Sequence, residues 1–170
     1  MIRIVQYAAI AGFILCLIIM YTTNSGIRGL RKYDANFKLL EMRFHYTADD
    51  VSGVFEKLGK DGRALYRNFW ILDFFFIACF LIVMLAIMNK VIIDSYARNI
   101  LAILAISRAF FDIVENGILL YLSNIYPDRN NALATICSWV TTCKFISLYA
   151  WILGFVAITL YPVINRKFSS

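Results

Sequence analysis

Charged and amide side chains stand inside a long apolar run at residues 107–117, where they could do chemistry. These side chains belong to Arg108, Asp112, Glu115 and Asn116. Their spacings of four, three and one residues put them on one stripe of an α-helix. Charged groups are costly in membrane hydrocarbon, and there they face protein partners or a water-filled cavity. The stripe therefore predicts a polar centre that other helices enclose.

Two charged residues on other apolar runs reach a similar predicted depth. Asp73 lies about four residues inside its run and Lys144 about five or six residues inside the last run, roughly 6–10 Å deep at the helical rise. Glu115 lies at a matching level. We predict that Arg108 pairs with Asp112 within one helix. Lys144 is expected to bridge to Glu115, with Asp73 as a further partner.

The predicted centre combines three acids with two bases, which leaves one net negative charge when every group is ionised. One carboxyl could then hold a proton beside the buried lysine. Such an arrangement suits proton transfer, cation coordination or the binding of a lipid headgroup. A purely structural interpretation stands beside these, because polar side chains also hold helices together in membrane bundles. Asp73 could equally be an interfacial residue outside the network.

Composition places the chain in a membrane. Its 170 residues are 61% hydrophobic and 16% charged, whereas soluble domains are about half apolar and a quarter charged. The net charge of +6 is not gathered on a basic face with interleaved aromatic residues. We interpret the Lys and Arg residues as flanks of membrane spans that meet anionic headgroups, and expect no nucleic-acid partner.

The cysteines and the single histidine predict no redox or metal chemistry. Cys16, Cys79, Cys137 and Cys143 form no C-x-x-C pair, and each lies in or beside an apolar run. A quinone-linked thiol oxidoreductase would need a reactive pair. His45 stands alone, without a second histidine or a cysteine at metal-ligand spacing. We expect buried structural thiols, no metal site and no cofactor.

The elements that must position these residues are four apolar runs, at about 4–21, 69–88, 99–122 and 139–161. Each is long enough for a membrane helix. No small-residue cleavage site follows the first run, so we expect a retained span rather than a signal peptide. The predicted fold is an all-α membrane protein, a four-helix bundle that forms a single membrane domain over residues 1–170.

A polar loop at about 24–68 holds one further helix. Thr47 and Asp50 have the spacing of a capping box, apolar residues then recur at helical spacing, and Gly59 is a plausible stop. The sequence predicts a short amphipathic helix at 48–58, which lies in the membrane interface or folds over the bundle. It would cover the charged centre.

The charge distribution gives two conflicting signals about the orientation of the chain in the membrane. The first and third loops hold more Lys and Arg than the termini and the second loop, which places the long loop in the cytosol. Acidic residues dilute that loop, and a first span led by Arg3 favours an N-terminus inside. We favour both termini in the cytosol, in a membrane that the sequence does not specify.

Several short motifs together resemble a family of small four-span membrane proteins, mostly bacterial. The motifs are Tyr46-Thr47, Leu58-Gly59, Gly62-Arg63 with Tyr66, the acid Asp73, Asp112-x-x-Glu115-Asn116, Tyr126-Pro127 and Lys144, over roughly residues 44–150. The resemblance implies the architecture and the choice of polar residues, but no activity. Related chains often carry a proline after the acid of the second span, where this chain has Phe and Ile.

These observations leave several functions open. The favoured hypothesis is a non-enzymatic protein whose polar centre binds a lipid, a small apolar ligand or a partner helix. The alternative enzyme would modify a lipid, with Glu115 or Asp73 as general acid or base and Lys144 as electrostatic partner. A proton-coupled carrier would use Glu115, Asp112 and Lys144. Expected partners are membrane lipids, with another membrane protein or self-association as further possibilities.

Overall fold

The computed structural model describes residues 2–168, and the side chains of residues 3–161. Every regular element in that range is helical: α1 (Ile2–Thr22), α2 (Ile27–Leu30), the 3-10 turn η1 (Leu40–Met42), α3 (Ala48–Val91), α4 (Ser95–Ile125) and α5 (Asn131–Phe168). The all-α prediction is confirmed for this part of the chain. Ser169 and Ser170 of the predicted domain lie outside the described residues, as do the side chains of Arg166 and Lys167.

Three helical segments are long and apolar enough to cross a membrane: Arg3–Leu30, Ala48–Val91 and Asn131–Tyr161. The helix α4, with 31 residues, is within the same range of lengths. It is not among the three because Arg108, Asp112 and Glu115 interrupt its apolar middle. Whether α4 crosses a membrane therefore depends on where those three charges lie.

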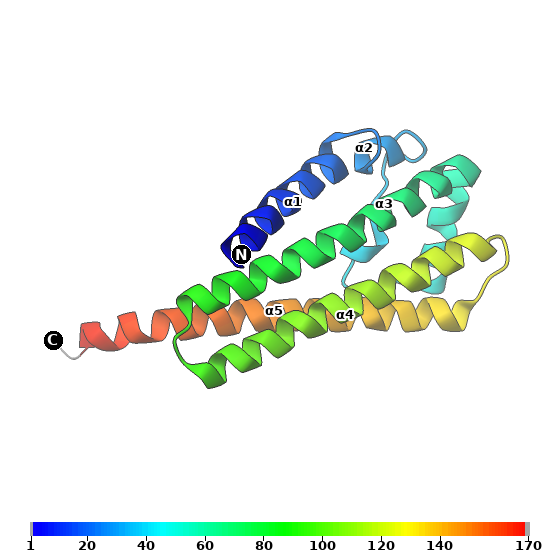
Figure 1. The fold of residues 1–170 in the computed structure, drawn as a ribbon. Coiled ribbons are helices and arrows are strands. Elements are labelled where there is room, and N and C mark those ends of the chain that lie inside the picture. The colour runs from blue at the N-terminus through cyan, green and yellow to red at the C-terminus, as the bar shows by residue number, and fades with distance from the viewer. Residues whose placement is uncertain (1, 169–170) are drawn as a thin grey trace.

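Successive long helices lie side by side (Figure 1). α3 packs against α4, α4 packs along α5, and α1 runs along α3. The start of α1, the α3–α4 turn and the end of α5 lie at one end of the molecule (Figure 1). The α1–α3 connection and the α4–α5 loop lie at the other end, which we call the loop end.

Gly59 divides α3 into two helical segments. The first segment begins with the predicted capping box, in which Thr47 Oγ1 accepts from the Asp50 N–H at 3.1 Å and Asp50 Oδ2 accepts from the Thr47 N–H at 2.8 Å. Gly59 then has φ 61° and ψ −168°, a conformation that glycine alone adopts readily. The short helix and its stop are thus confirmed.

The short helix packs on the loop end of the bundle through its apolar face. Phe55 lies edge-on to Trp70, with ring centroids 6.4 Å apart, and edge-on to Tyr126 at 6.1 Å. Val51 and Leu58 are buried beside it. Of the two predicted positions, the structure shows the one folded over the bundle.

The long helices extend beyond the predicted apolar runs because capping residues, not hydropathy, set their ends. α4 begins four residues before the predicted start, where Asp94 Oδ2 accepts from the Ala97 N–H at 2.6 Å. α5 begins eight residues early, where Asn130 Oδ1 accepts from the Leu133 N–H at 3.0 Å. The predicted runs are the apolar middles of longer helices.

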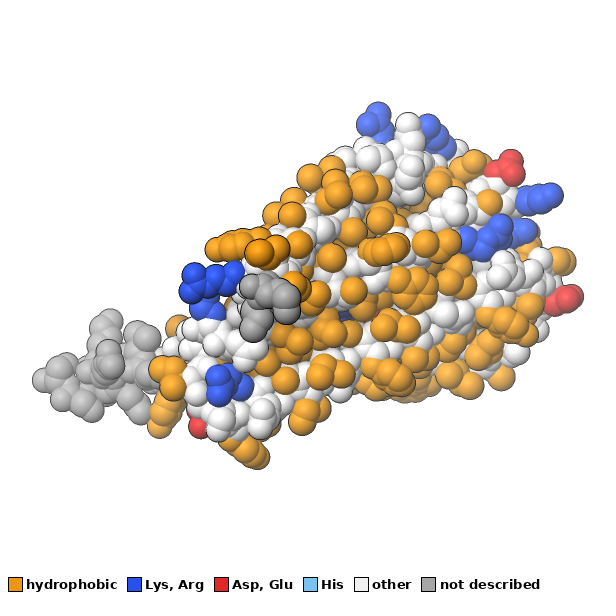
Figure 2. Space-filling model, viewed as in Figure 1, with side chains coloured by type: hydrophobic (Ala, Val, Ile, Leu, Met, Phe, Trp, Pro, Cys, Tyr) orange, Lys and Arg blue, Asp and Glu red, His pale blue; other side chains and the backbone are white. Residues whose placement is uncertain are grey.

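Buried residues form three layers along α3, α4 and α5. The layer at the loop end is apolar and includes Trp70, Leu119 and Cys137. The opposite layer is also apolar and includes Met84, Leu101 and Trp151. The buried charged residues lie between these two layers on each of the three helices. Apolar side chains cover the flank of the molecule in view, and Lys and Arg gather toward its two ends (Figure 2).

Candidate functional site

The polar stripe of α4 is buried, as predicted. Arg108 is 6% exposed, Asp112 2%, and Glu115 and Asn116 are fully buried. All four side chains therefore turn inward, and the apolar residues Ile106, Phe110 and Ile113 of the same helix are exposed. This distribution follows from the period of the helix, which separates the two groups onto different faces.

Lys144 of α5 is the centre of the buried ion-pair network. Its Nζ lies 2.5 Å from Glu115 Oε2 and 3.2 Å from Asp112 Oδ1. The same ammonium donates to the backbone carbonyl of Glu41 at 2.7 Å. Three acceptors use the three protons of the ammonium. The predicted Lys144–Glu115 bridge is confirmed, and Asp112 is an additional partner.

Arg108 forms the predicted ion pair with Asp112, one helical turn away. Its guanidinium also lies over the ring of Phe80, 4.5 Å from the ring centroid. Two guanidinium nitrogens, Nε and Nη1, have no hydrogen-bond acceptor among the described residues. Buried donors are usually satisfied, so Arg108 keeps unused hydrogen-bonding capacity.

Asp73 of α3 belongs to the centre but does not pair with Lys144. Its Oδ2 accepts from Asn116 Nδ2 at 2.7 Å, and the residue is 6% exposed. The expected Lys144–Asp73 bridge is therefore wrong, because the ammonium has three nearer acceptors. The interfacial interpretation of Asp73 is also wrong. Asn116, the last residue of the stripe, links α4 to α3 through this hydrogen bond.

Glu41 is a buried acid that the sequence reasoning missed. It is 4% exposed, its Oε2 accepts from the Tyr66 hydroxyl at 2.5 Å, and Oε1 has no partner among the described residues. The pKa of Glu41 is raised to about 8, chiefly by burial and also by the nearby Asp73 and Glu115 carboxyls, while the hydrogen bond from Tyr66 lowers it. The one sequence signal was an acid among Leu39, Leu40 and Met42.

Thr141 and Tyr46 extend the network to the α1–α3 connection. Thr141 Oγ1 lies 2.6 Å from Glu115 Oε1 and 3.1 Å from the Tyr46 hydroxyl. The Tyr46 hydroxyl also lies 3.1 Å from Cys137 Sγ. Burial raises the pKa of Tyr46, so its hydroxyl stays neutral. The face of α5 that carries Thr141, Lys144, Ser147 and Trp151 is buried.

Residues 39–46, which we call the roof segment, cover the charged centre. The Leu40 N–H donates to the Tyr66 hydroxyl at 3.0 Å, and the Tyr46 N–H donates to Ser138 Oγ at 2.9 Å. Thr142 Oγ1 donates to the Phe44 carbonyl at 2.9 Å. The prediction that the helix at 48–58 covers the centre is therefore wrong, because its apolar face packs on Trp70 and Tyr126.

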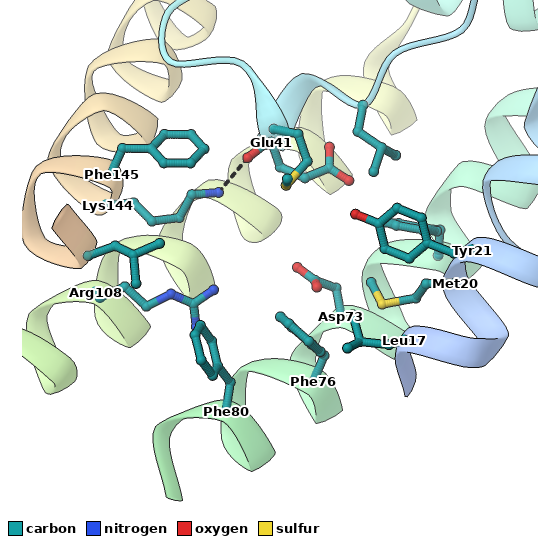
Figure 3. Close-up of a pocket in the computed structure, with 14 residues that line it drawn as sticks. Leu17, Met20, Tyr21, Glu41, Asp73, Phe76, Phe80, Arg108, Lys144 and Phe145 are labelled. Carbon is teal, nitrogen blue, oxygen red and sulfur yellow. Dashed lines mark hydrogen bonds between the residues drawn. The ribbon is translucent and has the colours of Figure 1, made fainter. Parts of the chain in front are cut away.

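A cavity of about 250 Å³ lies beside the network, under the roof segment. α1 lines one side with Leu17, Met20 and Tyr21, and α5 lines another with Phe145 and Leu148 (Figure 3). The polar lining consists of Tyr21, Glu41, Asp73, Arg108 and Lys144. The remaining lining is apolar and rich in phenylalanine from α3.

The buried centre thus has an inner part and a cavity-facing part. Glu115 and Asp112 do not line the cavity, and their partners are Lys144, Arg108 and Thr141. Asp73 and Arg108 line it, and Figure 3 shows the Asp73 carboxylate pointing into it. The inner part suits a structural role. The cavity-facing part keeps polar atoms without hydrogen-bond partners, such as Arg108 Nε and Nη1, that a ligand could bind.

The described residues contain no group of three metal-ligating side chains. All four cysteines are free thiols, with Cys16 and Cys137 buried and Cys79 and Cys143 partly buried. His45 Nδ1 lies 2.9 Å from Ser138 Oγ, at the edge of the roof segment. Comparisons of the chain with protein-family models, curated proteins and solved structures found no match.

Proposed function

We propose that this protein spans a membrane four times and binds an amphiphilic molecule, a lipid or a small apolar ligand with a polar end, without chemically changing it. The main support for this proposal is the cavity of about 250 Å³, whose walls are mostly apolar and whose polar lining includes Asp73 and Arg108. Ligand sites typically combine apolar walls with a few placed polar groups. An amphiphile matches both parts of this lining.

The pairing of the buried charges of α4 supports its role as a membrane span, in addition to α1, α3 and α5. Arg108, Asp112 and Glu115 are all paired within the protein, so crossing the membrane would expose none of them to acyl chains. The outward residues of the same helix, among them Ile106 and Ile113, are apolar. Its 31 residues span about 46 Å at the helical rise, more than the hydrocarbon thickness.

The position of α1 supports access to the cavity from the side of the bundle. α1 packs along α3, and α5 packs along α4. The cavity lies between lining residues of α1 and α5 (Figure 3). A lipid could therefore place its polar end in the cavity while its tails stay in the bilayer.

The enzyme alternative that uses Glu115 and the carrier alternative receive less support, whereas an enzyme that uses Asp73, which lines the cavity with Lys144, stays a second candidate. Glu115 is fully buried, is bonded to Lys144 and Thr141, and does not line the cavity, so a ligand there would not reach it. Apolar layers around Leu119 and Leu101 close both ends of the charged stripe, which disfavours a proton path. Partner-helix binding, the family resemblance and the cytosolic termini stay predictions.

The test fills the cavity with a larger side chain. Leu148→Trp narrows it from α5, whereas Leu153→Trp, on the same helix at a residue 69% exposed, leaves it open. We expect native mass spectrometry of the purified proteins to show a retained lipid or added amphiphile with Leu153→Trp and none with Leu148→Trp. Equal retention by both variants, and by Leu17→Trp on the opposite wall, would contradict the proposal.

A further inference from the structure

The buried ion pairs do not include Asp73, an acid that lines the cavity. Among the described residues, Asp112 pairs with Arg108 and Lys144, and Glu115 pairs with Lys144. Asp73 has only the amide of Asn116 as partner, on Oδ2. Its carboxyl group therefore points into a mostly apolar cavity with unused hydrogen-bonding capacity and no direct ion-pair partner among the described residues.

Glu41 does not supply a second full charge at this wall. The raised pKa of about 8 keeps Glu41 mostly protonated at neutral pH. Its unpartnered Oε1 adds hydrogen-bonding capacity near the cavity, and Tyr21 adds a hydroxyl that points inward (Figure 3). Asp73, whose one hydrogen-bond partner among the described residues is an amide, is thus the lining acid that a bound cation can reach.

We infer that the cavity selects amphiphiles whose polar end carries a protonated amine, which would bind to Asp73. This inference rests on the proposed function, because it concerns the same cavity. An ammonium would neutralise the carboxylate through charge-assisted hydrogen bonds, which are strong where water is excluded. A neutral or anionic polar end would give the ionised form of Asp73 no such stabilisation.

The aromatic lining favours the same chemistry. Phe69, Phe76 and Phe80 border the cavity together with Tyr21. Aromatic faces attract ammonium groups, and one of these rings, Phe80, already holds the Arg108 guanidinium at 4.5 Å. An ammonium beside Asp73 would therefore meet both a carboxylate and aromatic rings.

Arg108 completes the expected headgroup. Its unpartnered Nε and Nη1 are donors on a residue 94% buried at the wall of the cavity, so they favour a hydrogen-bond acceptor near the amine. An aminophospholipid places a phosphate near its amine, and a single-chain amino alcohol places a hydroxyl there. The shared chemistry is a primary ammonium on an apolar chain, with an acceptor beside it.

The first experiment compares three single-chain probes that differ only in the polar end: dodecylamine, dodecanol and dodecanoate. Binding to the full chain in maltoside detergent is measured by calorimetric titration, with concentrations expressed per micelle. We expect dodecylamine to bind at least tenfold more tightly than dodecanol, and dodecanoate to bind most weakly. Asp73→Asn should remove the preference for the amine, whereas Asp61→Asn, an exposed acid outside the cavity, should keep it.

The outcomes separate this inference from the proposed function. Equal binding of the three probes, lost with Leu148→Trp, would overturn amine selectivity and keep amphiphile binding. No saturable binding of any probe would overturn both. If Asp73→Asn does not fold, the ranking of the probes on the unchanged chain decides the matter, and tighter binding of dodecanoate contradicts the inference.

A second experiment distinguishes the two sources of the amine. The protein is reconstituted with equal amounts of phosphatidylethanolamine and phosphatidylglycerol, and retained lipid is identified by native mass spectrometry. Retention of phosphatidylethanolamine supports a bilayer lipid. Retention of neither lipid, with tight dodecylamine binding, supports a single-chain amine. Preferential retention of phosphatidylglycerol overturns the inference.

Discussion

Lys144 connects residues that are far apart in the chain. Its ammonium joins α5 to Asp112 and Glu115 of α4 and to the Glu41 carbonyl of the roof segment. Removing one member of a buried ion pair leaves an uncompensated charge, which is more costly than the pair itself is stabilising. We therefore expect substitutions of Lys144 to affect the packing of α4, α5 and the roof segment together.

Glu41 makes stability depend on pH. Its pKa is about 8 in the folded protein against an ordinary 4.5, so the folded state holds a proton that the unfolded state releases. The Glu41 contribution to stability is therefore lost as pH rises from about 4.5 to 8. The free energy of unfolding of the unchanged protein should fall relative to that of Glu41→Gln as pH rises from 5 to 8. The change in the difference should be on the order of 3 kcal/mol. Unfolding by sodium dodecyl sulfate at several pH values measures this difference.

The groups that face Glu41 define the control for that experiment. They are Tyr66 and Asp73 of α3, Glu115 of α4 and Lys144 of α5. Glu56→Gln changes an exposed acid of the short helix and leaves all of these in place. It should follow the pH profile of the unchanged protein, and a parallel profile for Glu41→Gln would refute the assignment.

At the residue scale, helical spacing found the members of the centre that lie on long helices. Arg108, Asp112, Glu115 and Asn116 share a stripe, so burying one buries all four. Helical spacing could not predict that Glu41 is buried, because the position of Glu41 depends on how the irregular α1–α3 connection packs on the bundle. It also could not decide whether Lys144 or Asn116 would be the partner of Asp73.

At the element scale, Gly59 sets the angle between the short helix and the rest of α3. Its φ of 61° and ψ of −168° are costly for residues with a Cβ. Gly59→Ala should therefore lower the free energy of unfolding by about 1–3 kcal/mol. Gly53→Ala is the matched control, since Gly53 is helical and an added Cβ meets no atom within 4 Å.

The control substitution should stabilise the protein slightly, by about 0.5–1 kcal/mol, because alanine favours helix more than glycine does. Unfolding of both variants in detergent, followed by circular dichroism, gives the comparison. Equal stability of Gly59→Ala and Gly53→Ala would mean that the break at Gly59 is not required.

Hydropathy located the apolar part of each long helix but not its ends. The runs at 99–122 and 139–161 lie within α4 and α5, whose starts depend on the side chains of Asp94 and Asn130. The capping box at Thr47, in contrast, could be read from the sequence, because its two residues have a fixed spacing. Local signals therefore predicted local structure, and burial required the assembled bundle.

At the scale of the whole molecule, a polar layer lies between two apolar layers. This arrangement accounts for how α4 could cross a membrane although it carries three charges: the paired charges face α3 and α5 while apolar residues face outward. If α4 crosses, the α3–α4 turn lies on the opposite side from both other connections.

Labelling of single added cysteines tests that topology. Asn36→Cys in the α1–α3 connection and Asp128→Cys in the α4–α5 loop should react with an impermeant maleimide from the same side, and Ser95→Cys from the other; all three residues are exposed. The chain without an added cysteine gives the background of the natural thiols, and opened membranes give full labelling. Labelling of Ser95→Cys and Asp128→Cys from one side would mean that α4 does not cross.

The most direct test of the buried polar centre is a double-mutant cycle on Glu115 and Lys144, whose charged atoms lie 2.5 Å apart. The free energies of unfolding of Glu115→Gln, Lys144→Met and the double variant are measured in detergent. We predict that each single change costs about 3 kcal/mol. The double change should cost at least about 1 kcal/mol less than the sum. Strictly additive losses, or single changes without cost, would contradict a buried network that joins α4 to α5.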